Sequence, residues 1–270
     1  MPKPVTPKIN PSNTTVEALL PPKVLLPDIA APDRDVVEDS VNSDVENTLF
    51  GETLPSRSFV SRALFSYDVP EVKNLQASFV YNYFTMKKQV ARTLFDTRFI
   101  SPFTEYFGVW NDSQVPNTYS HYSDIVMETL LQGLQTKMEK QTGYKLQPAY
   151  SYARIYKDGD ILHRHKDRYS CEISTTLNLG GDDWPIYLDP TGKQGQAGIK
   201  VKLNPGDMLI YSGCDLEHWR EEFMGKDCGQ VFLHYNKAGS KMAKENALDK
   251  RPLIGLPAWF KGTKLTNSTK

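Results

Sequence analysis

The sequence is poor in cysteine and lacks the spacing that cysteine-based sites need. Three cysteines occur in 270 residues, namely Cys171, Cys214 and Cys228. An odd number of widely separated cysteines excludes a disulfide framework and a zinc ribbon, because both are built from closely spaced pairs. We interpret the three side chains as reduced, buried or inert thiols.

Excess charge and long apolar runs are also missing. Lys plus Arg and Asp plus Glu both number 32, so the formal net charge is zero. A dedicated nucleic-acid binder would carry an excess of cations for phosphate, and nucleic acid is therefore not an expected partner. No apolar run approaches the roughly 18 residues of a membrane span, and the first residues lack the apolar stretch of a secretory signal. We expect a cytoplasmic protein with no membrane contact.

The composition divides the chain into three parts. Residues 1–56 hold half of the 18 prolines and an acidic run with few aromatics, which predicts a poorly structured tail or a strap along the domain surface. A docking arm for a partner is the alternative. Residues 57–236 form one continuous domain. Residues 237–270 are rich in Lys and Arg and predict a solvated basic tail, with nucleic-acid contact as the alternative.

Ahead of residue 146, local sequence patterns predict one strand and two helices. Residues 76–84 are aromatic and favour a β-strand, whereas residues 85–95 favour a short helix. A second helix is expected over 123–141, where apolar side chains recur at helical spacing. Ser123 can cap its start and Gly143 can close it.

From residue 146 onward the pattern changes to short strands. Eight runs of β-forming residues are separated by turn signals such as Asp158-Gly159 and Pro205-Gly206. Short strands with no helix between them predict a barrel or sandwich rather than an α/β sheet. The expected class is therefore mainly β with flanking helices, an α+β arrangement.

The most informative segment is 161–168, Ile-Leu-His-Arg-His-Lys-Asp-Arg. Alternate residues of a strand share a face, so His163, His165 and Asp167 are predicted on one side. A carboxylate turned inward is costly without a partner. A divalent cation held by His165 and Asp167 removes that cost.

A later predicted strand offers a third ligand. His218 follows Asp167 by 51 positions, in the run Glu217-His218-Trp219. Two histidines and one carboxylate on one face of an octahedral metal leave three positions open, which is typical of non-haem Fe(II) oxygenases. His165, Asp167 and His218 are therefore the candidate metal ligands and catalytic centre.

The other three histidines are weaker candidates. His163 is a rival ligand, but no acidic residue follows it two positions later, and we interpret it as lying beside the site or in the core. His121 and His234 are interpreted as structural, with His121 also a candidate for the rim of a pocket.

These residues resemble the 2-oxoglutarate- and Fe(II)-dependent oxygenases, and within them the prolyl-4-hydroxylase-like branch. His165-x-Asp167 follows a Tyr-rich strand and a glycine turn, and His218 follows a Pro-Gly-Asp turn, as in that family. The resemblance covers residues 76–236 and is most specific over 146–236.

The resemblance implies both fold and activity. The fold is a double-stranded β-helix, a cupin-like jelly roll with a supporting helix layer, to which residues 123–141 would contribute. The cofactor is Fe(II) and the co-substrates are 2-oxoglutarate and O2, with ascorbate as an optional addition. The reaction releases succinate and CO2 and hydroxylates an unactivated C–H bond, here on a protein or peptide side chain. A non-catalytic jelly-roll module, a cupin-like metalloenzyme without 2-oxoglutarate and an oxidative nucleic-acid demethylase are the alternatives.

The sequence departs from the branch at the cation for the far carboxylate of 2-oxoglutarate. The branch carries Lys or Arg on the last strand, where this chain has Cys228. Arg220 is our candidate instead, because it is predicted on the inward face with His218 and its planar fork suits a carboxylate. Tyr156 is expected to donate a hydroxyl, with Gln230 assisting.

Alternatives for the cations stay open at this point. Lys226 is the second candidate, although its surroundings are typical of an exposed turn. Arg220 could instead pair with either glutamate that follows it. Arg168 either faces the substrate or pairs with Glu172.

Aromatic residues ahead of the strand region are candidates for a lid or for substrate contacts. They are Tyr106, Trp110, Tyr119 and Tyr122.

Overall fold

The structure is a computed structural model that describes residues 48–49, 52–53, 58–61, 70–191, 193 and 195–261. Nearly all of the Pro-rich segment 1–56 lies outside these residues, and so do the tail, strap and docking-arm hypotheses for it. No helix in the described ranges is long and apolar enough to cross a membrane.

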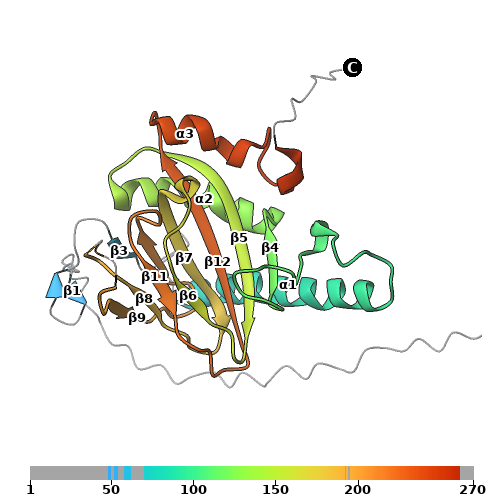
Figure 1. Ribbon diagram of the computed structural model, residues 1–270. Coiled ribbons are helices and arrows are strands. Elements are labelled where there is room, and N and C mark those ends of the chain that lie inside the picture. The colour runs from blue at the N-terminus through green and yellow to red at the C-terminus, as the bar shows by residue number, and fades with distance from the viewer. Residues whose placement is uncertain are drawn as a thin grey trace, which may run out of the picture. The chain divides into compact units, whose positions relative to one another are not determined.

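Most strands belong to two antiparallel sheets (Figure 1). The six-stranded sheet has the order β3 (Ser58–Ser61), β10 (Met208–Tyr211), β7 (Ile173–Gly181), β12 (Asp227–Lys237), β5 (Leu146–Lys157) and β4 (Tyr119–Tyr122). The four-stranded sheet has the order β6 (Leu162–His165), β11 (His218–Arg220), β8 (Ile186–Leu188) and β9 (Ile199–Val201). Two short strands, β1 (Thr48–Leu49) and β2 (Glu52–Thr53), pair with each other.

From β5 to β12 the chain passes back and forth between the two sheets. β5, β7, β10 and β12 lie in the larger sheet, whereas β6, β8, β9 and β11 lie in the smaller one. Strands that are neighbours in space are therefore distant in sequence, as in a double-stranded β-helix or jelly roll. The eight runs predicted from residue 146 onward are β5 to β12, so the expected mainly β class with flanking helices is confirmed.

Helices α1 (Pro70–Asp96) and α2 (Ile125–Thr142) pack on one face of the six-stranded sheet (Figure 1). On β12, Val231 and Leu233 join the apolar cluster that these helices complete. Because side chains alternate along a strand, residues such as Gln230 and His234 point to the opposite face. That opposite face carries the polar residues discussed below.

The strand predicted over residues 76–84 is wrong, because these residues belong to α1. Ala77, Val80, Phe84 and Ala91 recur at intervals of three, four and seven residues, and all four are buried. This is the period of a helix with one apolar face. The aromatic content of the segment reflects that buried face rather than a strand.

Helix α2 occupies the predicted position, but its cap differs. The N-cap is Asp124, whose carboxylate accepts a hydrogen bond from the backbone N–H of Val126 at 2.9 Å. Ser123 instead has a φ of 57°, and its hydroxyl accepts a hydrogen bond from Arg251. Gly143 ends the helix in the left-handed conformation, as predicted.

The solvated basic tail predicted over 237–270 is wrong for its described part. Helix α3 (Lys241–Asn246) is followed by the 3₁₀ turns Ala247–Lys250 and Ala258–Phe260. Arg251 is buried and donates to Glu128 at 3.0 Å, and neither side chain is more than 2% exposed. A buried ion pair therefore fixes this segment to α2.

Breaking that pair is expected to destabilise the protein strongly. Arg251→Met leaves the Glu128 carboxylate buried without its cation, which costs roughly 3–5 kcal/mol of unfolding free energy. Lys241→Met removes an exposed partner of Glu245 and is expected to cost no more than about 0.5 kcal/mol. Urea unfolding of both variants measures the difference, and equal losses would contradict the role given to Arg251.

Candidate metal centre

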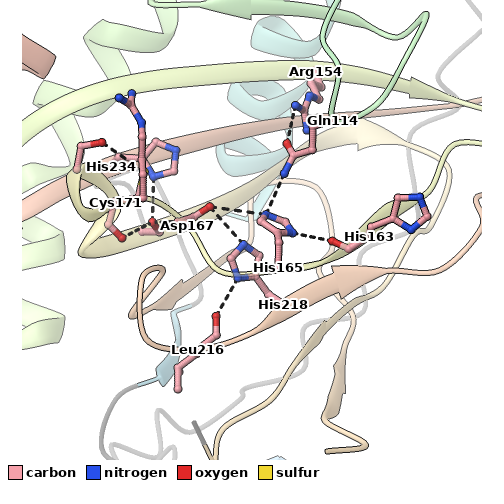
Figure 2. A network of polar contacts seen from close by, with 12 residues as sticks. Gln114, Arg154, His163, His165, Asp167, Cys171, Leu216, His218 and His234 are labelled. Atoms are coloured by element: carbon pink, nitrogen blue, oxygen red, sulfur yellow. Dashed lines mark hydrogen bonds and ion pairs between the residues drawn. The ribbon is translucent and has the colours of Figure 1, made fainter. Parts of the chain in front are cut away.

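Three side chains converge on one point between β6 and β11 (Figure 2). His165 ends β6 and pairs with His218 at the start of β11, and Asp167 follows two residues after β6. The Nε2 atoms of His165 and His218 lie 3.7 and 3.6 Å from Asp167 Oδ1. One ligand atom from each residue lies within 4.8 Å of the other two. A single ion placed between them can contact all three.

The two imidazoles are held in the tautomer that a metal needs. Nδ1 of His165 lies 2.7 Å from the carbonyl oxygen of His163, and Nδ1 of His218 lies 3.1 Å from that of Leu216. Because a carbonyl oxygen can only accept, each Nδ1 carries a proton, which leaves Nε2 as the nitrogen that can offer a lone pair to a metal. Metal-binding histidines use their second nitrogen in this way. The donor set of two imidazoles and one carboxylate therefore fits Fe(II).

The Asp167 carboxylate is ionised and held in place. Burial disfavours its charged form, but the neighbouring histidines, His218 foremost, lower its pKa to about 2. Ser174 Oγ donates to Asp167 Oδ2 at 3.2 Å, and the Asp167 backbone N–H donates to Gly213 at 2.9 Å. These contacts leave Oδ1 facing the two imidazoles. Burial and the neighbouring His218 lower the pKa of His165, which favours the neutral ring.

Gly213 has no side chain, and the Asp167 carboxylate lies in the space that a side chain at this position would fill. A methyl group at this position would lie 2.5 Å from both Asp167 Oδ2 and Ser174 Oγ. We expect Gly213→Ala to displace the carboxylate and to weaken metal binding by roughly 10- to 100-fold, the range seen when groups that orient ligands are lost. Anaerobic Fe(II) titration measures the effect. Gly133→Ala, on α2 where the added methyl meets nothing within 4 Å, is the matched control, and equal affinities in the two variants would contradict this role.

Strand β6 is irregular, so the predicted alternation fails there. His165 pairs with His218, and Leu162 pairs with Arg220. The step between the two pairs is three residues on β6 and two on β11, so the register shifts between them. This bulge turns both Leu162 and His165 toward the cavity and leaves His163 exposed. Figure 2 shows His163 directed away from the ligands. The prediction that His163 shares their face is wrong.

The three candidate ligands open into a cavity of about 240 Å³. One part of its lining is formed by Leu162, Ile186, Tyr211 and Phe232. Besides the ligands, the other lining residues are Asp112, Gln114, Tyr150, Tyr152, Arg154 and His234. Gln114 is exposed, so the cavity reaches solvent on this second side.

Arg220 is a buried cation beside the cavity. Its cross-strand neighbour Leu162 lines the cavity, and Arg220 itself is 1% exposed. The guanidinium donates to the carbonyl of Trp184 and to Gln230 Oε1, the latter at 3.2 Å, while its Nε has no hydrogen-bond partner. Within the described residues no carboxylate lies at ion-pair distance from it, so the salt bridge to either following glutamate is not formed. Burial lowers the pKa of this group.

The structure separates the other residues considered for the co-substrate. Gln230 contacts Arg220 directly, whereas the Tyr156 hydroxyl accepts from Arg154 at 3.4 Å, and the Tyr156 ring and the Arg220 guanidinium both lie against the Trp184 ring. Lys226 is exposed and lies outside the cavity lining. Its backbone N–H donates to Asp182 at 2.6 Å, in a surface turn. Arg220 and Gln230 therefore form a buried pair, with Tyr156 on the Trp184 side of it, and Lys226 lies apart from them.

A polar group on the solvent side of the cavity was missed from the sequence. Arg154 donates to Asp112 and, at 2.7 Å, to Gln114 Oε1, while Tyr152 also donates to Asp112. Burial opposes the charge of Asp112, but Arg154 holds its pKa below the usual value. Arg154 and Tyr152 alternate along β5 with Tyr156, a pattern that is visible in the sequence. Asp112 and Gln114 lie in a loop that no sequence pattern singled out.

The four aromatic residues considered for a lid do not line the cavity. Tyr119 and Trp110 pack against each other and against the apolar cluster under α1. The Tyr122 hydroxyl donates to Asp249 at 2.6 Å, and Tyr106 is exposed. The prediction that these residues contact the cavity is wrong: three of the rings pack in the core or join an ion-pair network, and the exposed Tyr106 ring lies edge-on to Trp259.

Arg168 has a structural partner, but a different one from that predicted. Its guanidinium donates to Asp249 at 3.0 Å and lies over the Tyr150 ring, whereas Glu172 pairs with Lys237. The C-terminal segment thereby contacts the residue that follows Asp167.

Two further histidines have distinct roles. His121 lies with its ring nitrogens 3.0 Å from backbone carbonyl oxygens of Tyr122 and Tyr106, outside the cavity lining, as expected of a structural residue. His234 lines the cavity, and burial lowers its pKa to about 4. Its Nδ1 lies 2.9 Å from Ser174 Oγ, the same hydroxyl that contacts Asp167. His234 therefore helps to hold Asp167, a candidate ligand, through Ser174 as well as filling the core.

A second group of three residues shares Asp167 with the first. Ligand atoms of Asp167, Cys171 and His234 also lie within 4.8 Å of one another. Burial raises the pKa of Cys171 to about 12, so a metal there would have to displace the thiol proton, whereas each imidazole can offer its Nε2 lone pair. The position between the two imidazoles is the better metal site. Cys228 is likewise buried with a raised pKa, as expected of inert thiols.

Comparisons with known proteins give similarity at the level of structure alone. No family model and no curated protein sequence matches the chain. A prolyl-4-hydroxylase from Pseudomonas putida is 9% identical, with a TM-score of 0.46, over 67% of this chain and 93% of its own. AviO1 from Streptomyces viridochromogenes Tue57 is 11% identical, with a TM-score of 0.48, over 69% of this chain and 92% of its own. HygX from Streptomyces hygroscopicus, with nickel and 2-oxoglutarate bound, is 12% identical, with a TM-score of 0.45, over 67% of this chain and 83% of its own.

Proposed function

We propose that this chain is an Fe(II)- and 2-oxoglutarate-dependent dioxygenase. The observation that carries the proposal is the convergence of His165 Nε2, His218 Nε2 and Asp167 Oδ1 on one point. Three protein ligands on one face leave the remaining positions of an octahedral ion for the co-substrates. Fe(II) held there would supply the redox chemistry with 2-oxoglutarate and O2 that side chains do not provide.

Arg220 is the proposed anchor for the far carboxylate of 2-oxoglutarate. A buried cation without a counter-ion is costly, and a carboxylate would remove that cost. Tyr211 and Leu162 both line the cavity; the Tyr211 ring lies 4.8 Å from that of His218, and Leu162 is the cross-strand neighbour of Arg220. A dicarboxylate that extends from the ligands past Tyr211 would therefore approach Arg220.

Arg154 is the other cation near the cavity, and its charge is already balanced. Its guanidinium is paired with Asp112, whereas Arg220 has hydrogen-bond acceptors but no anion. Gln230 is proposed to orient the Arg220 guanidinium, and Tyr156 to donate its hydroxyl to the same carboxylate. Cys228, at the position where the resemblance leads us to expect a cation, is consistent with a cation moved to β11.

The proposed reaction is hydroxylation of an unactivated C–H bond on a protein or peptide side chain, with release of succinate and CO2. The cavity of about 240 Å³ is smaller than the roughly 300–1,000 Å³ typical of sites for drug-sized ligands. A site of this size suits one side chain presented at a time. The apolar lining from Leu162, Ile186 and Phe232 would keep water from the reacting groups.

Anaerobic addition of Fe(II) and then 2-oxoglutarate tests the proposal. We expect one Fe(II) per chain, a weak visible charge-transfer band once 2-oxoglutarate is added, and succinate after O2 is admitted. Absence of both the band and succinate would favour a non-catalytic jelly-roll module. A bound metal whose spectrum does not respond to 2-oxoglutarate, in the wild type as in Arg220→Met, would favour a cupin-like metalloenzyme without this co-substrate.

A further inference from the structure

The Gln114 side chain lies between a cation and a proposed metal ligand. Arg154 Nη2 donates to Gln114 Oε1 at 2.7 Å, and Gln114 Nε2 lies 3.1 Å from His165 Nε2 (Figure 2). On the far side of the ring, His165 Nδ1 lies 2.7 Å from the carbonyl oxygen of His163. The four groups form one continuous chain of hydrogen bonds.

The direction of every bond in this chain is fixed by chemistry. A guanidinium can only donate, so the Gln114 atom facing Arg154 is the amide oxygen and the atom facing His165 is the amide nitrogen. The carbonyl of His163 can only accept, so His165 Nδ1 carries the proton. His165 Nε2 must therefore accept from Gln114, and the bond uses the single lone pair of that nitrogen.

The Arg154 guanidinium, where this series of hydrogen bonds begins, is held in place by its own contacts. Its side chain is 5% exposed and is paired with Asp112, which also accepts from Tyr152 and from the backbone N–H of Gln114 at 2.8 Å. Gln114 is thus held at both its backbone and its amide oxygen. Its amide nitrogen is left to point at His165.

We propose that Gln114 and the metal compete for the same lone pair of His165, so that Gln114 is a competing donor that the metal displaces. This inference rests on the proposed function, because it takes His165 as a metal ligand. The tautomer that binding requires is set on the other side of the ring, by the contact of His165 Nδ1 with the His163 carbonyl, and does not depend on Gln114. Metal binding breaks the bond and releases the Gln114 amide, which links metal loading to the loop that borders the cavity.

If Gln114 competes with the metal, removing its side chain should raise the affinity for the metal, whereas most substitutions beside a metal site lower it. Gln114→Leu removes the competing donor and is expected to tighten Co(II) binding by roughly 2- to 10-fold, the value of one ordinary hydrogen bond. Gln114→Asn keeps the amide but is one methylene too short to span Arg154 and His165, and is expected to tighten binding similarly. Gln114 lies in an exposed loop, so neither change should disturb folding. Both variants also lose the hydrogen bond from Arg154 to Gln114 Oε1. This loss changes the free energy of the metal-free and the metal-bound protein equally, so it does not change the affinity for the metal.

Titration of the full chain with Co(II) against a chromophoric chelator measures this affinity, and the visible Co(II) spectrum reports whether the ligand set is unchanged. Gln132→Leu, at an exposed position of α2, is the matched control and is expected to bind as the wild type does. Tighter binding in both Gln114 variants, with the wild-type spectrum, supports the inference. Equal or weaker binding in those variants overturns it, whereas a wild-type chain that binds no Co(II) overturns the metal site proposed above.

Discussion

Asp167→Asn is expected to lower the affinity for Fe(II) by more than about 100-fold and to abolish succinate formation. Loss of groups that merely orient ligands costs roughly 10- to 100-fold, and Asp167 would be a ligand itself. The substitution keeps the shape of the side chain but removes the negative charge that faces His165 and His218. Two neutral imidazoles and an amide are a much poorer set for Fe(II). Anaerobic Fe(II) titration and an assay for succinate measure the two effects.

Asp183→Asn is the matched control for this change. Asp183 is an exposed carboxylate paired with Lys202 at 2.6 Å, well outside the residues that line the cavity. The control is expected to retain wild-type affinity and turnover. Fe(II) affinity that survives in Asp167→Asn would show that this carboxylate is not a ligand.

Arg220→Met is expected to raise the KM for 2-oxoglutarate by roughly 10- to 100-fold while leaving Fe(II) affinity unchanged. A charged hydrogen bond to a carboxylate is worth about 1.5–3 kcal/mol, which corresponds to a change of this size. Methionine has a similar length but no charge. Stability is expected to be unchanged or raised, since a buried cation without an anion is removed. Steady-state kinetics and urea unfolding together test this combination.

Arg154→Met serves as the comparison, because it is expected to lower stability and to have less effect on the KM for 2-oxoglutarate. It leaves Asp112 partly buried without its cation, so the unfolding free energy is expected to fall. The KM for 2-oxoglutarate is expected to change less than in Arg220→Met. If Arg220→Met were strongly destabilised with an unchanged KM, Arg220 would be a structural residue and another group would hold the co-substrate.

The strand region could be predicted well because its signals are local. Turn sequences such as Asp158-Gly159 mark where β5 to β12 begin and end, and alternation along β5 and β12 follows from strand geometry. Placing His165, Asp167 and His218 together needed one further step, since strands distant in sequence had to be neighbours. The candidate ligands were identified from residue type and order, and the structure brings their ligand atoms together.

Other features could not be predicted because they depend on contacts between distant segments. The bulge in β6 is set by pairing with β11, so strict alternation put His163 on the wrong face. The basic C-terminal segment was expected in solvent because its buried partner, Glu128, lies far away in sequence. Gln114 entered the site through its contacts with Arg154 and His165, which no local pattern indicates.

An anaerobic crystal structure of the full chain with Mn(II), an oxygen-stable substitute for Fe(II), tests the central claim most directly. The account predicts one anomalous-scattering peak, within bonding distance of Nε2 of His165, Nε2 of His218 and a carboxylate oxygen of Asp167. A peak between Asp167, Cys171 and His234 instead, or no peak at any of these residues, would contradict it.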